Sequence, residues 1–265
     1  MLQVSLDLKA EADDFYGFLI TLDPEDWKRP TLFKEWTPWD IVAHLHYFDR
    51  VSLVSLQGPE AFAVERQKLI EALKAGTSAV ELHRNLLGEL GPQELLDTWH
   101  RSCRDMADEL GACDPKTRLP WFGPDMGVPM FTTARYMETW SHAQAVHDLM
   151  QVERSNTDRI KNIAVIGMKT FGWTFVNRGL EVPGPPPYVR LVAPSGEIWE
   201  WNDPSESEFV RGEAVDFCQT VTQVRNVADT ALEVKGEVAS QWMSIAQCFA
   251  GGAEDPPKPG ARTGS

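Results

Sequence analysis

The stretch FTTARYMETWSHAQAVHDLM, residues 131–150, has the pattern of a helix that carries polar groups on one face. Residues four apart on a helix lie side by side, with about 5–6 Å between their Cβ atoms. Glu138 and His142 have this spacing. At about 100° per residue, their face of the helix also carries Ala134, Ser141, Ala145 and Leu149. The sequence therefore predicts an imidazole beside a carboxylate on what we expect to be the buried face of this helix.

This pairing of Glu138 with His142 has two interpretations. A buried carboxylate is costly unless it is neutralised or paired with a cation, so a metal ion bound by both side chains would explain it. A core histidine that hydrogen-bonds to Glu138 would explain it equally well. The helix by itself leaves both interpretations open.

A second helix is predicted to begin at Thr37 and Pro38. Thr37 suits the N-cap, Pro38 the first helical position and Asp40 the third. The inward face of this helix is predicted to consist of Ile41, His44, Leu45 and Phe48. The same rotation places His46 on the outward side, so His44 is the histidine of this helix that we expect to face the core.

The first 152 residues show helical patterns and no strand signal, which is typical of a four-helix bundle. The segment 111–129 is rich in proline and glycine and is expected to be a loop that leads into the central helix. The other helices of this part are predicted near residues 8–22, 60–75, 77–90 and 92–110.

From residue 153 to residue 250 the pattern changes to that of a small α+β domain. A strand at 188–193 is followed by a Pro-Ser-Gly turn and a second strand at 198–201, which predicts a hairpin. Further elements are expected as a strand near residue 209, a helix at 213–224, a short strand at 232–234 and a helix at 237–249. The last residues, 251–265, have the composition of a disordered tail.

The composition limits the classes of partner. Lys and Arg number 25 against 39 Asp and Glu, which gives a net charge of −14, so nucleic acid and anionic membranes are poor candidates. The sequence lacks both a run of about 18 apolar residues and a basic segment followed by an apolar one at its start, so we expect a cytoplasmic protein. The four cysteines show no paired spacing that would indicate a disulfide scaffold or a thiolate zinc site.

A metal ion on Glu138 and His142 requires at least one more protein ligand, and a catalytic site leaves further positions to water or substrate. His44 is the natural third ligand, because bundles build metal sites from facing helices. Two histidines and one carboxylate suit Zn²⁺, although Fe²⁺, Ni²⁺ and Mn²⁺ also accept such a set.

Two motifs at these positions resemble those of a known family. WTPWDIVAHL, residues 36–45, resembles the W-t-x-x-d-v-x-x-H-L signature of the DinB/YfiT-like bundles, in particular the mycothiol-dependent maleylpyruvate isomerase branch. RYMETWSHAQAV, residues 135–146, resembles the second motif of that branch, in which a Glu and a His four residues later join the first His on a divalent metal. The resemblance implies the metal ligands His44, Glu138 and His142.

The part of the chain after the bundle is similar to the sterol-carrier-like second domain of many actinobacterial members of this branch. The similarity lies in the hairpin after VRLVAPSG and in the closing segment WMSIAQCFAGG. One departure concerns the bundle, where Ala145 stands at the position at which family members commonly have an Asp. Any role of that acid in holding the substrate is therefore missing from this chain.

The resemblance implies a divalent-metal enzyme that activates a low-molecular-weight thiol, with mycothiol as co-substrate, for isomerisation or transfer on a small acidic or carbonyl substrate. Two alternatives remain open: a hydrolase, hydratase or lyase that uses metal-bound water, and a non-catalytic protein that binds an apolar ligand. A homodimer is also compatible with the sequence.

Arg135 is the candidate catalytic residue beyond the metal ligands. It lies about 60° from Glu138 around the helix axis, and a guanidinium can hold a substrate carboxylate with two hydrogen bonds. An ordinary solvated salt bridge is the alternative for Arg135. His83 and His100 have no partner at metal-ligand spacing and are expected to be ordinary polar residues.

Overall fold

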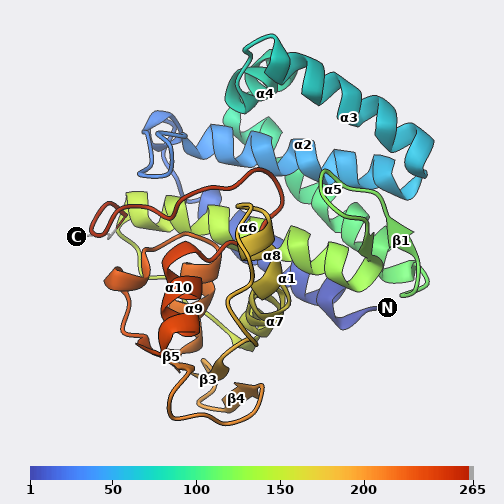
Figure 1. Cartoon of the computed structure of the whole chain (residues 1–265). Coiled ribbons are helices and arrows are strands. Elements are labelled where there is room, and N and C mark those ends of the chain that lie inside the picture. The colour runs from blue at the N-terminus through green and yellow to red at the C-terminus, as the bar shows by residue number, and fades with distance from the viewer. Residues whose placement is uncertain (263–265) are drawn as a thin grey trace. The chain divides into compact units, whose positions relative to one another are not determined.

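The computed structural model describes residues 1–262. The chain divides into two compact units between Leu149 and Met150, where the sequence predicted a boundary at residue 152. The first unit is helical and the second combines a small sheet with helices (Figure 1). The predicted fold class is confirmed.

The first unit is built from α-helices of 9 to 23 residues. Its helices are α1 (Gln3–Leu19), α2 (Pro38–Leu56), α3 (Pro59–Lys74), α4 (Ala79–Leu87), α5 (Pro92–Ala112) and α6 (Val128–Met150), with a 3-10 turn η1 (Asp26–Lys28). Helix α5 packs against both α1 and α2, and α3 and α4 lie along α2 (Figure 1). The core between them includes an edge-to-face contact of Phe15 with Trp99, whose ring centres are 5.6 Å apart.

The start of α2 has the predicted cap. The Thr37 hydroxyl accepts a hydrogen bond from the Asp40 amide, and the Asp40 carboxylate accepts one from the Thr37 amide, so each satisfies the other's free group. Asp40 also accepts hydrogen bonds of 2.8 Å from Nε and Nη2 of Arg84, which lies on α4. This ion pair fixes α4 against the first turn of α2.

Helix α2 is covered on more than one side, and the prediction that His46 faces outward is wrong. His46 is 4% exposed, and its Nδ1 is 2.9 Å from the hydroxyl of Ser102 on α5. His46 does lie on a different side of α2 from His44, but that side is also covered, because α5 packs on one side of α2 while α3 and α4 pack on another. The periodicity of one helix does not reveal how many of its faces are covered.

Helix α6 is buried over most of its circumference. The positions around Glu138 that the sequence assigned to the buried face are its less buried face, with partly exposed Ala134, Glu138, Ser141, Ala145 and Leu149. About 60° from Glu138 around the same helix, Arg135 bonds through Nε and Nη2 to Oδ1 of Asp49, at 3.1 and 2.9 Å. Trp99 Nε1 donates to the other oxygen of Asp49. A buried ion pair therefore joins α6 to α2.

The segment 111–129 is not entirely a loop. Strands β1 (Arg118–Leu119) and β2 (Met126–Gly127) pair antiparallel immediately before α6 begins. The amide of Val128 donates to the carbonyl of Thr117, which fixes the start of α6 to this short hairpin.

The second unit is a four-stranded mixed sheet with helices. Its strands β3 (Tyr188–Val192), β4 (Ile198–Trp201), β5 (Phe209–Glu213) and β6 (Glu233–Lys235) have the order β4-β3-β5-β6. β3 pairs antiparallel with β4 as the predicted hairpin, and parallel with β5. The helical elements of this unit are η2 (Asp158–Ile160), α7 (Lys161–Lys169), α8 (Phe171–Val176), α9 (Ala214–Val221), η3 (Val227–Asp229) and α10 (Glu237–Ile245).

Part of the segment predicted to be a disordered tail makes hydrogen bonds within this unit. Asn226 donates to the carbonyl of Pro257, the amide of Gly260 donates to Asp229, and Arg262 donates to the carbonyl of Gln223. Residues 263–265 of the expected tail lie outside the described residues.

Among residues 1–262, no helix has both the length and the apolar character that crossing a membrane requires.

We expect Asp40 to make the fold sensitive to acid. Burial by itself raises the pKa of Asp40, but hydrogen bonds from Arg84 and Thr37 outweigh burial and hold the pKa below its usual value. The ionised carboxylate therefore stabilises the fold above its unfolded pKa of about 4, and this contribution is lost as the pH falls through the lower folded pKa.

Asp40→Asn should accordingly lower the free energy of unfolding at pH 7 by about 1 kcal/mol, the size of a lost helix cap. The difference from wild type should shrink below about pH 4. Urea unfolding over a pH series measures it, with the exposed Asp105 on α5 changed to Asn as the control. An Asp40→Asn difference that stays constant with pH would contradict this assignment.

The buried pair of Asp49 and Arg135 gives a second stability prediction. Asp49→Leu leaves the Arg135 guanidinium buried without its counter-charge, and should lower the free energy of unfolding by about 3–5 kcal/mol. The double variant with Arg135→Leu should lose less than Asp49→Leu alone, because it removes the unpaired charge. Chemical unfolding of the two single variants and the double variant measures this coupling. Strictly additive losses would contradict it.

Candidate metal centre

The structure brings His44, Glu138 and His142 together. One ligand atom from each of the three lies within 4.8 Å of the others. Oε2 of Glu138 is 3.3 Å from Nε2 of His142 and 3.8 Å from Nε2 of His44. The two imidazole centres are 4.7 Å apart. Side chains from α2 and α6 therefore converge on one point with their donor atoms.

These separations fit a shared cation. Zinc lies about 2 Å from histidine nitrogen and carboxylate oxygen, so tetrahedral ligands of one ion are roughly 3–4 Å from each other. Both measured distances from Glu138 fall in this range. The donor set of two imidazoles and one carboxylate also leaves a coordination position for a further ligand.

The protonation states of the site suit a metal as well. Burial lowers the pKa of His44 to about 3, so its imidazole is neutral. Burial alone would raise the pKa of Glu138, but hydrogen bonds from His142 and His44 outweigh burial and hold the pKa well below its usual value. A neutral imidazole and an ionised carboxylate are the forms that bind a divalent cation.

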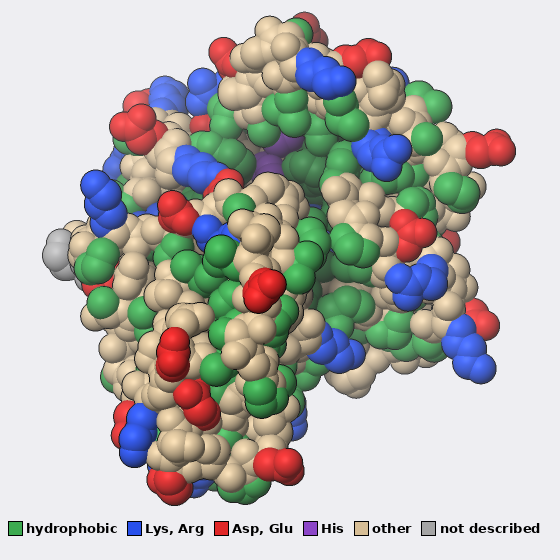
Figure 2. All heavy atoms as spheres, viewed as in Figure 1, with side chains coloured by type: hydrophobic (Ala, Val, Ile, Leu, Met, Phe, Trp, Pro, Cys, Tyr) green, Lys and Arg blue, Asp and Glu red, His purple; other side chains and the backbone are tan. Residues whose placement is uncertain are grey.

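Aromatic side chains surround the two ligand imidazoles. Trp36 stacks nearly parallel to His142, with ring centres 5.7 Å apart, and its centre is 5.1 Å from that of His44. Phe33 meets His142 edge to face, and Phe48 contacts His44. Figure 2 shows histidine side chains visible from solvent and bordered by hydrophobic side chains. The surroundings are apolar, which strengthens electrostatic interactions at the site.

Arg135 lies in the interior, where its guanidinium forms an ion pair with Asp49. Arg135 is 3% exposed, and both its Nε and its Nη2 donate to the Asp49 carboxylate. Its positive charge contributes to the low pKa of Glu138. The structure thus gives Arg135 a partner that the sequence did not indicate, one that lies 86 positions away in the chain.

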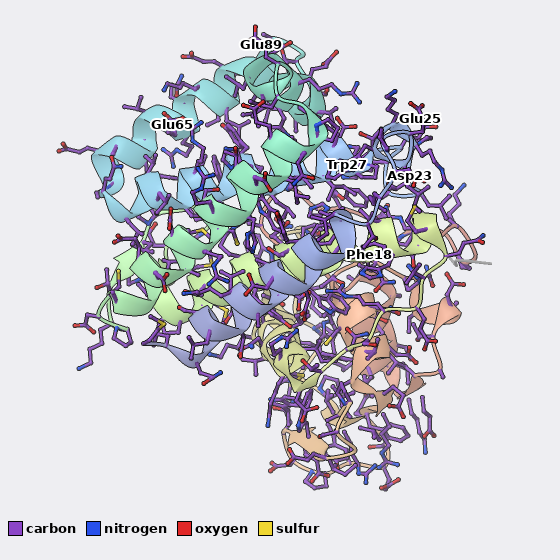
Figure 3. The ribbon with its side chains drawn as sticks, turned by 180° about the vertical axis from the view of Figure 1, so that it is seen from behind. Phe18, Asp23, Glu25, Trp27, Glu65 and Glu89 are labelled. Carbon is purple, nitrogen blue, oxygen red and sulfur yellow. The ribbon has the colours of Figure 1, made fainter. Side chains whose placement is uncertain are left out.

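The other histidines lie in different surroundings. His100 bonds to Asp13 at 2.7 Å, and His147 stacks on Phe18, which is labelled in Figure 3, with ring centres 3.9 Å apart. His83 departs from expectation, because it is 1% exposed and its ring centre lies 5.4 Å from that of His44. His83 lies on the short helix α4, whose local sequence gave no signal of this contact.

Comparison with known proteins gives three findings. Residues 8–147 match the family described as "Mycothiol maleylpyruvate isomerase N-terminal domain". Uncharacterized proteins of two Mycobacterium tuberculosis strains are each 36% identical over 246 residues, which cover 92% of this chain and 94% of theirs.

The third finding is a likeness of fold. The crystal structures of the mycothiol-dependent maleylpyruvate isomerase and of a mutant of it each match with a TM-score of 0.51 and 13% identity. Each match covers 82% of this chain and 87% of the other. The family match includes all three converging side chains and covers more than half of the chain, so this protein belongs to the mycothiol maleylpyruvate isomerase N-terminal domain family.

Proposed function

We propose that the protein is a divalent-metal-dependent enzyme of the maleylpyruvate isomerase-like group, with His44, Glu138 and His142 as the metal ligands. The convergence of these three side chains within 4.8 Å is the observation that supports this function best. Zinc is the metal that we propose first, because it accepts two imidazoles and a carboxylate and keeps a position open.

We further propose that the second substrate is a low-molecular-weight thiol, with mycothiol as the first one to test. Two neutral imidazoles and one carboxylate leave a divalent ion with a net positive charge, which favours an anionic ligand. The ion would supply two kinds of chemistry, lowering the pKa of a bound thiol and polarising a carbonyl. The family to which the chain belongs supports the choice of thiol.

The residues of the chain prepare the site for this chemistry. The Glu138 carboxylate lies 3.3 Å from Nε2 of His142 and 3.8 Å from Nε2 of His44, and Trp36 stacks on His142, so these contacts orient the imidazoles before anything binds. Phe33 lies edge to face with His142 and Phe48 lies beside His44, so apolar rings border both imidazoles. Such preorganisation lowers the energy that must be spent on reorientation during the reaction.

The substrate proposed for this site is a small acidic or carbonyl compound that undergoes isomerisation or thiol transfer. The positive charge of Arg135 helps to lower the pKa of Glu138, and its bond to Asp49 holds α6 to α2. We therefore propose that Arg135 supports the metal ligands without contacting the substrate. Addition of a thiol to a conjugated acid, rotation about the resulting single bond and elimination of the thiol would isomerise a cis double bond to trans. The thiol is regenerated, so atoms and electrons balance.

The metal site is tested by single alanine variants of the three ligands. The wild-type protein should bind one Zn²⁺ per chain, measured by competition with a chromogenic chelator. His44→Ala, Glu138→Ala and His142→Ala should each weaken binding by more than the roughly 10–100-fold that loss of an outer hydrogen bond costs. Full metal occupancy in His44→Ala would contradict the ligand set.

The control for this series is His100→Ala, which removes a histidine that bonds to Asp13 and has no part in the cluster. It should bind metal as the wild type does. Circular dichroism and thermal unfolding of each variant separate two roles of the metal. Variants that stay folded without metal favour catalysis, whereas variants that unfold with metal loss would identify a structural ion.

The thiol is tested on the protein loaded with Co²⁺, whose spectrum reports its ligands. Titration with mycothiol should produce a thiolate-to-metal charge-transfer band, while glutathione and bacillithiol serve as comparison thiols. The same titration of Glu138→Gln should give a weaker band or none. If none of the thiols changes the spectrum of an intact site, thiol chemistry is excluded and assays for water-based lyase, hydratase or hydrolase activity replace it.

A further inference from the structure

His83 is the buried histidine that the proposed metal site does not use. It lies on α4, is 1% exposed, and neither of its ring nitrogens has a hydrogen-bond partner among residues 1–262. A neutral imidazole has one donor and one acceptor, and burying both without partners is costly. A group so placed requires a partner that the present arrangement of side chains does not supply.

His44, a proposed metal ligand, also has a ring nitrogen without a hydrogen-bond partner among the described residues. Its Nε2 faces the carboxylate of Glu138, whereas its Nδ1 is buried without a hydrogen-bond partner in the described chain. Histidines that bind a metal through one nitrogen usually donate the other N–H to a neighbouring group, which fixes the orientation and tautomer of the ring. No such group is bonded to His44.

The imidazole rings of His44 and His83 are neighbours. Their centres are 5.4 Å apart and their planes make an angle of 64°. An N–H···N hydrogen bond of about 2.9–3.0 Å between two imidazoles places the ring centres roughly 5 Å apart when it is linear. A separation of 5.4 Å between ring centres is therefore compatible with such a hydrogen bond once the rings are turned so that two unused nitrogens face each other, and these nitrogens would then satisfy each other.

We propose that His83 is a positioning residue of the metal centre, which accepts a hydrogen bond from Nδ1–H of His44 when Nε2 of His44 holds the metal. This inference rests on the proposed metal site and adds a residue from a third helix to it. His83 touches neither metal nor substrate. It acts by fixing the tautomer and the direction of His44.

The surroundings of His83 hold it in place for this role. The neighbouring residue Arg84 forms the ion pair with Asp40, and Asp40 lies one helical turn before His44 on α2. The ring of Tyr47 lies 4.8 Å from His83, and Phe48 contacts both His83 and His44. One ion pair and two aromatic rings thus set α4 against α2 at the height of the metal ligand.

The test compares substitutions at His83 that differ in their ability to accept a hydrogen bond. His83→Phe keeps an aromatic ring and removes both nitrogens, and should weaken Zn²⁺ binding by about 10–100-fold, as loss of an outer hydrogen bond does. His83→Gln keeps an acceptor and should retain most of the affinity. His83→Met has nearly the shape of Gln without its carbonyl, and should bind as weakly as His83→Phe.

The matched control is His46→Phe, which also removes a buried histidine close to His44 but one that bonds to Ser102. Its Zn²⁺ affinity should stay close to that of wild type and should not show the roughly 10–100-fold loss expected for an outer hydrogen-bond partner. The Co²⁺ absorption spectrum gives a second readout, which should change in His83→Phe and His83→Met and be restored in His83→Gln.

Each outcome decides the inference. Equal Zn²⁺ affinity in wild type, His83→Met and His83→Gln would overturn the role of His83 while leaving the metal site intact. If His83→Phe does not fold, the comparison of Met with Gln at this position gives the answer. A wild-type protein that binds no metal would overturn the proposed function itself, and with it this inference.

Discussion

The candidate metal centre depends on one carboxylate, that of Glu138, whose side chain is only 23% exposed. Glu138 lies on the less buried face of α6, with its Oε2 3.3 Å from Nε2 of His142 on the same helix and 3.8 Å from Nε2 of His44 on α2. A carboxylate in such surroundings is stable only when positive charge or hydrogen-bond donors compensate for its lost hydration. His142 supplies a donor by helical spacing alone, whereas His44 can do so only because α2 is held at a fixed distance from α6.

Helix α2 is held by charged pairs at two levels. Near its first turn Asp40 bonds to Arg84 of α4, and further along Asp49 bonds to Arg135 of α6. His44 lies between these two pairs. Because both pairs have directional hydrogen bonds, they fix the rotation of α2 as well as its distance from its neighbours. His44, the proposed metal ligand, is therefore positioned by polar contacts above and below it, and by the apolar core on the remaining sides.

Membership in the family and geometry of the site support different parts of the functional conclusion. The match over residues 8–147 and the 36% identity to the mycobacterial relatives establish the family. The structural match at 13% identity concerns the fold only. Metal and thiol are proposals that rest on the donor set. Ala145, in place of an acid common in the family, gives a reason to expect a substrate different from that of the maleylpyruvate isomerases.

The sequence by itself determined what depends on neighbouring residues. Thr37, Pro38 and Asp40 marked the start of α2, and the spacing of Glu138 and His142 placed both on one face of α6, because caps and helical repeats are local properties. His44, the third candidate ligand, followed from the face of α2 to which the sequence assigned it. Only the tertiary structure decided how many sides of α2 are covered, which buried His46, and which distant group Arg135 meets. It also decided that His83 lies against His44. These contacts join positions 39 to 86 residues apart, and they depend on the packing of whole helices, which no local pattern specifies.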